Sequence, residues 1–258
     1  MTTVSKVAAA KRIVLKVGSS SITGANEAQL DAIVDLCVRL MSQGKEVVLV
    51  SSGAIATASP LIGLAAKPED LATSQALASI GQARLMGRYE RSLSRHNRIP
   101  GQVLLTVENI ADSQSSENAS RALERLIALE VLPIINENDS VATQEIRFGD
   151  NDQLAAKVAI LVNADLLILL SDIDSLYTKP PTEAGAERIE VVQFGEDLSG
   201  LDVSGTSTGY GTGGAVTKVV AATLATEAGV PVVLTSAQNA GLLDTSAVNH
   251  TLFLARTI

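Results

Sequence analysis

Two lysines of this chain stand where an ammonium group could bind an anion. Lys16 lies near the end of residues 12–17 (RIVLKV), a β-branched run typical of a buried strand. A buried ammonium is costly unless an anion meets it, which favours a phosphate clamp. Lys218 follows the glycine-rich run 209–217 at the start of an alanine-rich, helical segment. Backbone amides at a helix start, together with a fixed ammonium, form a cradle for a polyphosphate.

Polar residues also follow each of four expected strands. Because ligands of an open α/β sheet bind at the carboxyl ends of its strands, these residues are candidates for one site. Glycine and serine turns let backbone N–H groups approach an anion, and carboxylate or amide side chains can bind an amine or orient a metal-bound phosphate. Each turn alone is ordinary loop chemistry. The candidates are Gly18 and Ser19, Ser52 and Gly53, Asn136 and Asp139, and Ser171 and Asp172.

A further polar group, Gly149-Asp150-Asn151-Asp152, opens an expected helix. Asp or Asn at such a position accepts N–H bonds as a helix cap whatever else it does. Three such residues exceed what a cap requires, so Asn151 and Asp152 remain candidates for function.

Several classes of protein are excluded or disfavoured. The chain has no G-x-x-x-x-G-K-[ST] motif, no G-x-G-x-x-G after a strand and no Ser/His/Asp or Cys/His arrangement. Its 258 residues carry a net charge of −8 without a long basic run, so nucleic acid is not expected as a partner. No apolar stretch approaches the roughly 18 residues of a membrane span. The single Cys37, at an apolar-periodic position, is expected to be a core residue in a reducing cytoplasm.

The elements that must position these residues alternate between strands and helices. Strands are expected at 12–17, 46–50, 102–106, 131–136, 166–170 and 232–235, and helices at about 30–41, 74–97, 120–130, 152–161 and from 218. This alternation predicts an α/β fold: a three-layer αβα sandwich with a mainly parallel central sheet. Aromatic residues make up only 2% of the chain, so the core must be aliphatic.

Three segments depart from this rhythm. Residues 1–11 are expected to be a flexible polar tail, followed by one domain over 12–258. Residues 141–148 alternate with period two like a hairpin arm, and 178–214 are rich in Gly, Ser, Thr and Pro, which predicts a lid or loop region. The domain could form two lobes, at about 12–164 and 165–258.

Taken together, these phrases resemble the amino acid kinase family over nearly the whole chain, from about residue 13 to 254. Asn136-Glu137-Asn138-Asp139 and Gly149-Asp150-Asn151-Asp152 are the most specific, and they look like the branch that phosphorylates glutamate. The others are Lys16-Val17-Gly18-Ser19-Ser20, Ser51-Ser52-Gly53-Ala54-Ile55, Gly81-Gln82, Leu104-Leu105-Thr106, Pro133-Ile134-Ile135, and Gly211-Thr212-Gly213-Gly214 leading to Thr217-Lys218.

The resemblance implies a carbamate kinase-like fold, and transfer of the γ-phosphoryl of ATP to the side-chain carboxylate of L-glutamate, the first step toward proline. Lys16 and Lys218 would be catalytic, and Asp152 would orient them. The first lobe would bind glutamate through Ser52, Gly53, Asn136, Asp139 and Asn151. The second would bind ATP through Ser171, Asp172, Thr212, Gly213, Gly214, Ala215, Val216, Thr217 and Lys218, with Lys16 also reaching the nucleotide.

The resemblance also implies Mg²⁺ carried by the nucleotide, feedback inhibition by proline, possible contact with glutamyl-phosphate reductase, and a dimer or tetramer. A C-terminal PUA domain, which many relatives carry, is not expected. The chain departs from the family pattern at Ala58, Ser171, Ser175 and Ala215, which leaves the charged groups intact. Two alternatives stay open: another acceptor, such as acetylglutamate, aspartate, carbamate or a nucleoside monophosphate, and an amino-acid-binding regulatory module without catalysis.

Overall fold

The central sheet is built from aliphatic runs that are covered on both faces. In the computed structural model, which describes residues 2–64, 68, 70–141, 151–198 and 214–256, the five residues Leu166–Leu170 are each at most 1% exposed. A strand with helices on both sides buries every side chain, so it reads as a continuous apolar run. The expected aliphatic core is therefore confirmed.

The sheet has eight strands among the described residues, and they are parallel except where β9 meets β10. This arrangement confirms the expected fold class. Strand β1 lies between β2 and β5. Strands β4 and β3 lie beyond β2 on one side, and β9, β10 and β8 lie beyond β5 on the other. In sheet order the strands are β3 (Pro100–Leu105), β4 (Leu132–Glu137), β2 (Glu46–Ser51), β1 (Arg12–Val17), β5 (Leu166–Ser171), β9 (Val232–Ser236), β10 (Thr251–Phe253) and β8 (Val191–Val192).

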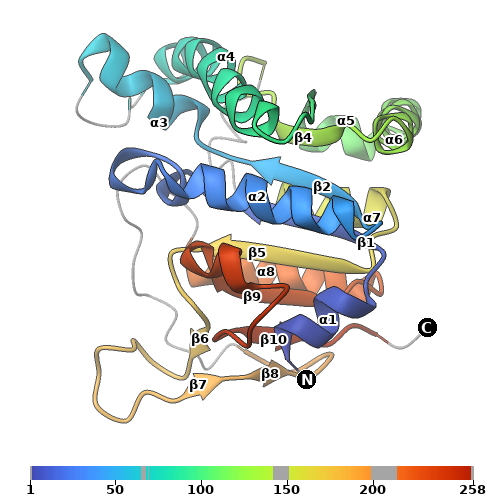
Figure 1. The fold of residues 1–258 in the computed structure, drawn as a ribbon. Helices are drawn as coiled ribbons and strands as arrows, with labels where there is room; N and C mark the ends of the chain where they lie inside the picture. The colour runs from blue at the N-terminus through green and yellow to red at the C-terminus, as the bar shows by residue number, and fades with distance from the viewer. Residues whose placement is uncertain (1, 65–67, 69, 142–150, 199–213, 257–258) are drawn as a thin grey trace.

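Helices cover both faces of this sheet (Figure 1). Helices α2 (Gln29–Ser42) and α4 (Leu71–Ser94) pack on one face with η5 (Ala237–Leu242). Helices α6 (Ser113–Ala128), α7 (Asn151–Leu161) and α8 (Ala215–Glu227) pack on the other. The other short helices among the described residues are α1 (Thr3–Ala9), η1 (Ser19–Ser21), η2 (Gly24–Asn26), α3 (Ala54–Ala58), η3 (Ser59–Ile62) and α5 (Val107–Ala111).

Alternation along β1 assigns its side chains to the two layers. Ile13, Leu15 and Val17 face the layer of α2, whereas Val14 faces the layer of α7 and α8. Successive side chains of a strand point to opposite faces, so Lys16 shares the face of Val14. The strand therefore presents its lysine to the two helices that begin with Asn151 and Ala215.

The N-terminal segment includes a short helix among its described residues. Residues Thr3–Ala9 form α1, which Thr2 caps by accepting a hydrogen bond from Ser5 N. Val7 is 1% exposed and packs into the core, and Lys45 Nζ donates to the carbonyls of Ala8 and Ala10. The short apolar run provides enough buried surface to dock one helix.

The glycine-rich region after β5 contains more regular structure than the expected lid. The described part of the expected region 178–214 includes β7 (Arg188–Ile189) and the edge strand β8. Strand β7 pairs antiparallel with β6 (Leu176–Tyr177), which lies just before the region. The expected hairpin arm at 141–148 lies outside the described residues except for Val141, as do residues 199–213.

Two further features bear on the predictions. Cys37 is fully buried in α2, as expected of a core residue, and burial raises the pKa of its thiol to about 12. None of the helices among the described residues combines the length and apolarity that crossing a bilayer would need.

Candidate active site

Three buried charged side chains meet near the carboxyl end of β1, in the middle of the sheet. Asp152, in the first turn of α7, is 0% exposed and binds a lysine at each carboxylate oxygen. Lys16 from β1 forms an ion pair with Oδ1, and Lys218 from the first turn of α8 lies 3.2 Å from Oδ2. The structure thus brings together the three residues that the sequence nominated as catalytic.

The charge of this cluster suits it to an anion. Two ammonium groups and one carboxylate sum to +1, and the lysine side chains are only 6% and 5% exposed. Charge buried in a low-dielectric site acts more strongly than charge in water. The amino ends of α7 and α8, where Asn151 and Ala215 begin the helices, add further partial positive charge. The arrangement can bind an anion and stabilise negative charge that develops on it.

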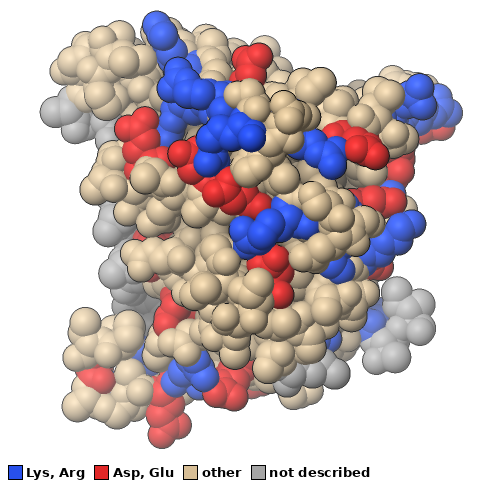
Figure 2. All heavy atoms as spheres, viewed as in Figure 1, with Lys and Arg blue, Asp and Glu red and all other residues tan. Residues whose placement is uncertain are grey.

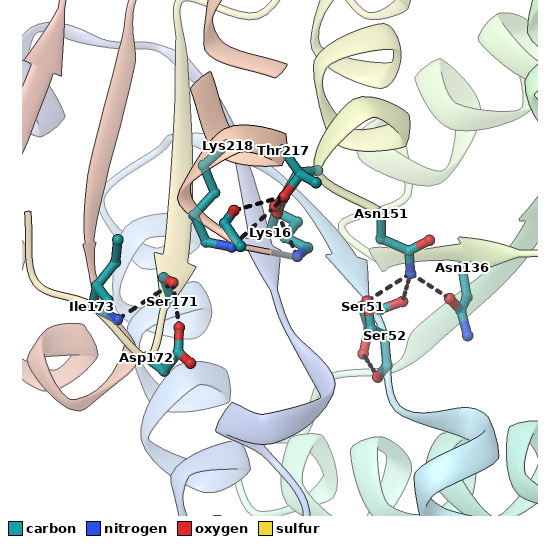
Figure 3. Close-up of polar contacts among 12 residues, drawn as sticks. Lys16, Ser51, Ser52, Asn136, Asn151, Ser171, Asp172, Ile173, Thr217 and Lys218 are labelled. Atoms are coloured by element: carbon teal, nitrogen blue, oxygen red, sulfur yellow. Dashed lines mark hydrogen bonds and ion pairs between the residues drawn. The ribbon is translucent and has the colours of Figure 1, made fainter. Parts of the chain in front are cut away.

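Thr217 faces this cluster. Its hydroxyl lies 3.2 Å from Asp152 Oδ2 and 2.9 Å from the carbonyl oxygen of Gly214. The sequence assigned Thr217 to ATP, and the geometry gives its hydroxyl a contact with the carboxylate that holds both lysines (Figure 3).

A second group of polar side chains lies on the β2 and β4 side of Lys16 (Figure 3). Asn151 Nδ2 lies 2.9 Å from Ser51 O, 2.8 Å from Ser52 Oγ and 2.8 Å from Asn136 Oδ1, so its two hydrogens are shared among three acceptors. Asn136 Nδ2 in turn donates to Gln82 Oε1 of α4 at 2.7 Å. Three predicted acceptor-binding residues, Ser52, Asn136 and Asn151, therefore form one network.

The other two predicted acceptor-binding residues lie in the loops beside this network. Gly53 has φ = 105°, a left-handed conformation that favours glycine, and it caps the start of α3. Asp139 lies in the loop that follows β4, three residues after Asn136. Gly53 thus meets a backbone requirement of the turn after β2.

A third group lies on the β5 side of the lysine cluster (Figure 3). Ser171, at the end of β5, is 4% exposed and donates to Asp172 Oδ1 at 2.9 Å. Gly214 caps α8 with no side-chain hydrogen bond, and Ala215 and Val216 form its first turn. Thr212 and Gly213, both predicted to contact ATP, lie outside the described residues.

Two contributors to the site were not assigned a role from the sequence: Gln82 and Tyr89, both in α4. Tyr89 is fully buried, and its hydroxyl lies 2.8 Å from Ser51 Oγ. Burial raises the pKa of this hydroxyl well above its ordinary value, so it stays protonated at physiological pH. A polar side chain on the inward face of a long alanine-rich helix is the signal that could have identified each.

The layout follows from the strand order. Ser52 directly follows β2, and Asn136 is the penultimate residue of β4. Ser171 ends β5 with Asp172 directly after it, and Lys16 is the penultimate residue of β1, which lies between β2 and β5. In open α/β sheets ligands bind where the strand order changes direction, at the carboxyl ends of the strands. The geometry therefore provides two adjoining half-sites with the cationic cluster at their boundary.

Among the described residues, no group of three or more His, Cys, Asp or Glu side chains is arranged to hold a metal ion. The buried carboxylate of the site, Asp152, has a lysine at each oxygen. Its donor capacity is thus directed to ammonium groups.

Comparison with known proteins supports this picture. Residues 11–236 match the amino acid kinase family. The chain is 60% identical over 230 residues to a protein of Clavibacter michiganensis subsp. michiganensis named glutamate 5-kinase, with 89% of each chain covered. It is 55% identical over 232 residues to one of the same name from Leifsonia xyli subsp. xyli, covering 90% of this chain and 86% of the relative.

The fold has a relative among solved structures. Carbamate kinase from Giardia lamblia bound to AMP-PNP superposes with a TM-score of 0.64 at 15% identity, covering 95% of this chain and 99% of that one. This likeness concerns the fold, and the matches in sequence extend it to the family. The chain therefore belongs to the amino acid kinase family.

Proposed function

We propose that this chain transfers the γ-phosphoryl group of ATP to the side-chain carboxylate of L-glutamate, giving L-glutamyl 5-phosphate. The observation that carries the proposal is the buried Lys16–Asp152–Lys218 cluster between two half-sites. The relatives named glutamate 5-kinase, at up to 60% identity, support glutamate as the acceptor. Formation of this acyl phosphate would be the first step toward proline.

The reaction requires two anions to meet. A carboxylate oxygen of glutamate attacks the γ-phosphorus, the bond from that phosphorus to the β,γ-bridging oxygen breaks, and ADP leaves with the electron pair. The nucleophile is already ionised at neutral pH and needs no general base. Catalysis then depends on positioning and charge, as in other phosphoryl transfers.

The cationic cluster would stabilise the transferring phosphoryl group. Lys16 and Lys218 approach Asp152 from β1 and α8, so one carboxylate holds both ammonium groups in place. Groups that are already oriented towards developing charge need no reorganisation during the reaction. We assign Lys16 and Lys218 to catalysis and Asp152 to their orientation.

The two half-sites would bind the two substrates. Ser52, Asn136 and Asn151 form the network on the acceptor side, and we assign them to glutamate together with Gly53 and Asp139. A free α-amino group calls for a carboxylate such as that of Asp139. Ser171 and Asp172 with the segment 212–218 would bind ATP at the start of α8. We propose accordingly that residues 12–164 form a glutamate-binding lobe and 165–258 an ATP-binding lobe.

Mg²⁺ fits this site when it is carried by the nucleotide. Phosphate oxygens are ligands that Mg²⁺ prefers, and the protein cations share the same phosphates. When bound, the ion would neutralise charge on the β- and γ-phosphates.

The test measures ADP release and trapping of the acyl phosphate with hydroxylamine, which converts it to a stable hydroxamate. L-Glutamate, acetylglutamate, aspartate, carbamate and UMP are compared as acceptors at equal concentration. The proposal predicts turnover and hydroxamate with L-glutamate. Turnover only with another acceptor would assign a different kinase, and binding of glutamate without turnover would assign a regulatory module.

Proline is proposed as an inhibitor that competes with glutamate for the loop at residues 136–139. The proline concentration that halves the activity should then rise linearly with glutamate concentration. Inhibition that is insensitive to glutamate would place proline at another site. Three further expectations remain proposals: a cytoplasmic location, a dimer or tetramer, and contact with a glutamyl-phosphate reductase. Sedimentation of the purified protein tests the oligomeric state.

A further inference from the structure

The amide network on the acceptor side has a defined polarity. Asn136 Oδ1 accepts from the backbone N–H of Glu137 at 2.9 Å, and a backbone N–H can only donate. Asn151 Nδ2 lies 2.9 Å from the carbonyl oxygen of Ser51, which can only accept. These two backbone partners identify which end of each amide carries the oxygen and which carries the nitrogen.

This polarity places one requirement on α4. With Asn136 Oδ1 turned towards Glu137 N and Asn151, its Nδ2 must face the helix and needs an acceptor there. Gln82 Oε1 supplies this acceptor at 2.7 Å. Asn136 is 2% exposed, so water could not easily replace a missing partner.

The position of Gln82 is itself held by close packing. At the preceding residue, Gly81, an added Cβ would lie 1.8 Å from the carbonyl oxygen of Ala54 in α3. The backbones of α3 and α4 therefore approach as closely as glycine permits. This contact fixes the position of α4, and with it the position of Gln82 relative to the end of β4.

The other end of the network is the hydroxyl of Ser52. Its oxygen accepts from Asn151 Nδ2, so the hydroxyl hydrogen points away from that amide. A hydroxyl in this state can donate to an anion such as a carboxylate. The network therefore transmits one orientation from Gln82 through Asn136 and Asn151 to Ser52.

We propose that Gln82 is a positioning residue for the phosphoryl acceptor, glutamate. It acts by orienting the amide of Asn136 and, through that amide, the hydrogen-bond donors that meet the carboxylate of glutamate. This inference rests on the proposed function, because it names the residue that organises the same glutamate site. It assigns to α4 a role in substrate affinity.

The primary experiment compares wild-type protein with Gln82→Met, which keeps the length of the side chain and removes the amide oxygen that accepts the hydrogen bond from Asn136. The expected result is a KM for glutamate raised by about tenfold, the effect of leaving one buried amide unpaired. The KM for ATP and kcat should stay within about twofold, because the lysine cluster is untouched. The control is Gln43→Met, the same substitution in an exposed residue that contacts Asp244 far from the site, and it should match wild type.

A double-mutant cycle separates positioning from a direct contact with substrate. If Gln82 acts only through Asn136, then adding Gln82→Met to Asn136→Ala should change the KM for glutamate by less than about twofold. Multiplicative effects of the two substitutions would overturn the proposal, as would an unchanged KM in Gln82→Met. If Gln82→Met lowers the thermal unfolding temperature, the same double-mutant cycle is measured with Gln82→Ala, because alanine favours the helical conformation.

The two proposals fail differently. Wild-type turnover with glutamate and an unchanged KM in Gln82→Met overturns the role of Gln82 alone. Wild-type protein that does not phosphorylate glutamate overturns the proposed function and this inference with it.

Discussion

At the residue scale, Asp152 determines how the two catalytic lysines are held. A buried carboxylate is stable only when paired, and here each of its oxygens engages a different lysine. Because the lysines come from β1 and α8, one side chain connects the centre of the sheet to the start of a helix. The same ion pair offsets the free-energy cost of burying the Lys16 ammonium group when no phosphate is bound.

Replacing Lys218 by alanine should lower kcat by a factor on the order of 10² or more, because its ammonium acts mainly on the transition state. The fold should persist, since Asp152 keeps its ion pair with Lys16. Steady-state kinetics together with circular dichroism measure both effects. Lys11→Ala removes the same charge from a side chain that is 75% exposed and should leave kcat unchanged. Wild-type turnover in Lys218→Ala would remove this residue from the site.

Thr217 offers a finer test of how the carboxylate is oriented. Thr217→Val keeps the shape and removes the hydroxyl that contacts Asp152 and Gly214. We expect kcat to fall by about tenfold, the effect of losing one hydrogen bond to a charged group. Thr217→Ser retains the hydroxyl and should stay within about twofold of wild type. Equal loss in both variants would mean that the hydroxyl contact with Asp152 does not by itself account for the role of Thr217.

At the scale of elements, α4 connects the packing of the fold to the acceptor site. It runs from Leu71 to Ser94 and is capped at its amino end by Asp70, whose side chain accepts a hydrogen bond from Thr73 N. Its inward face carries Gln82 and Tyr89, which contact the ends of β4 and β2. A displacement of this helix should therefore change substrate affinity as well as stability.

Gly81→Ala tests the close approach of α3 and α4. Its Cβ would lie 1.8 Å from a backbone carbonyl oxygen, so the helices must separate. We expect the free energy of unfolding to fall by about 1–3 kcal/mol, as in other overpacked sites, and the KM for glutamate to rise. Chemical denaturation and kinetics measure these.

Gly87→Ala is the matched control in the same helix, because nothing lies within 4 Å of its added Cβ. Alanine favours helix over glycine, so this variant should be more stable by about 0.5–1 kcal/mol. Equal behaviour of the two variants would show that α4 tolerates displacement.

At the scale of the whole molecule, the strand order assembles the site. Lys16, Asp152 and Lys218 are far apart in sequence and meet because β1 lies beside β5, with α7 and α8 on one face. Figure 2 shows basic and acidic side chains next to each other across one face. Ion pairs between such side chains include Arg88 with Glu27 and Arg95 with Asp35. A net charge of −8 therefore coexists with a locally cationic site.

The tie between the first and last parts of the chain should depend on pH. Arg39 of α2 donates to Asp244 at 2.8 Å, and this hydrogen bond lowers the pKa of Asp244 below its ordinary value of 3.8. A carboxylate with a lowered folded-state pKa stabilises the fold above its unfolded pKa, and the contribution is lost as pH falls through the folded value.

Arg39→Met should therefore lower the free energy of unfolding by about 1 kcal/mol at pH 7, and by progressively less below about pH 4. Denaturation curves at several pH values measure the difference. Arg121→Met removes an exposed pair with Glu117 and should have almost no effect at any pH. A deficit of the same size at pH 7 and pH 2.5 would mean that the Arg39 side chain stabilises by packing alone.

Local patterns explain how much the sequence determined by itself. Strand and helix periods report which residues share a buried face, so the parallel α/β class, the aliphatic core and most elements could be predicted. Boundaries were less certain. Helix α6 begins at Ser113, after the cap Asp112, and not near residue 120, because its first two turns are polar and carry no apolar period. Lys16 and Lys218 were candidates because an ammonium group in a buried strand, or after a glycine-rich run at a helix start, suits an anion, whereas the orienting role of Asp152 was implied by the family resemblance.

Only the tertiary structure decided which distant residues meet. The order of strands is set by crossover connections and not by any local period, so the place of β1 between β2 and β5 could not be read from the sequence. The same holds for α1, which packs on the core through Val7. It also holds for Gln82. Its role depends on one hydrogen bond across 54 residues. The sequence determined the chemistry of the groups, and the packing of the layers determined their geometry.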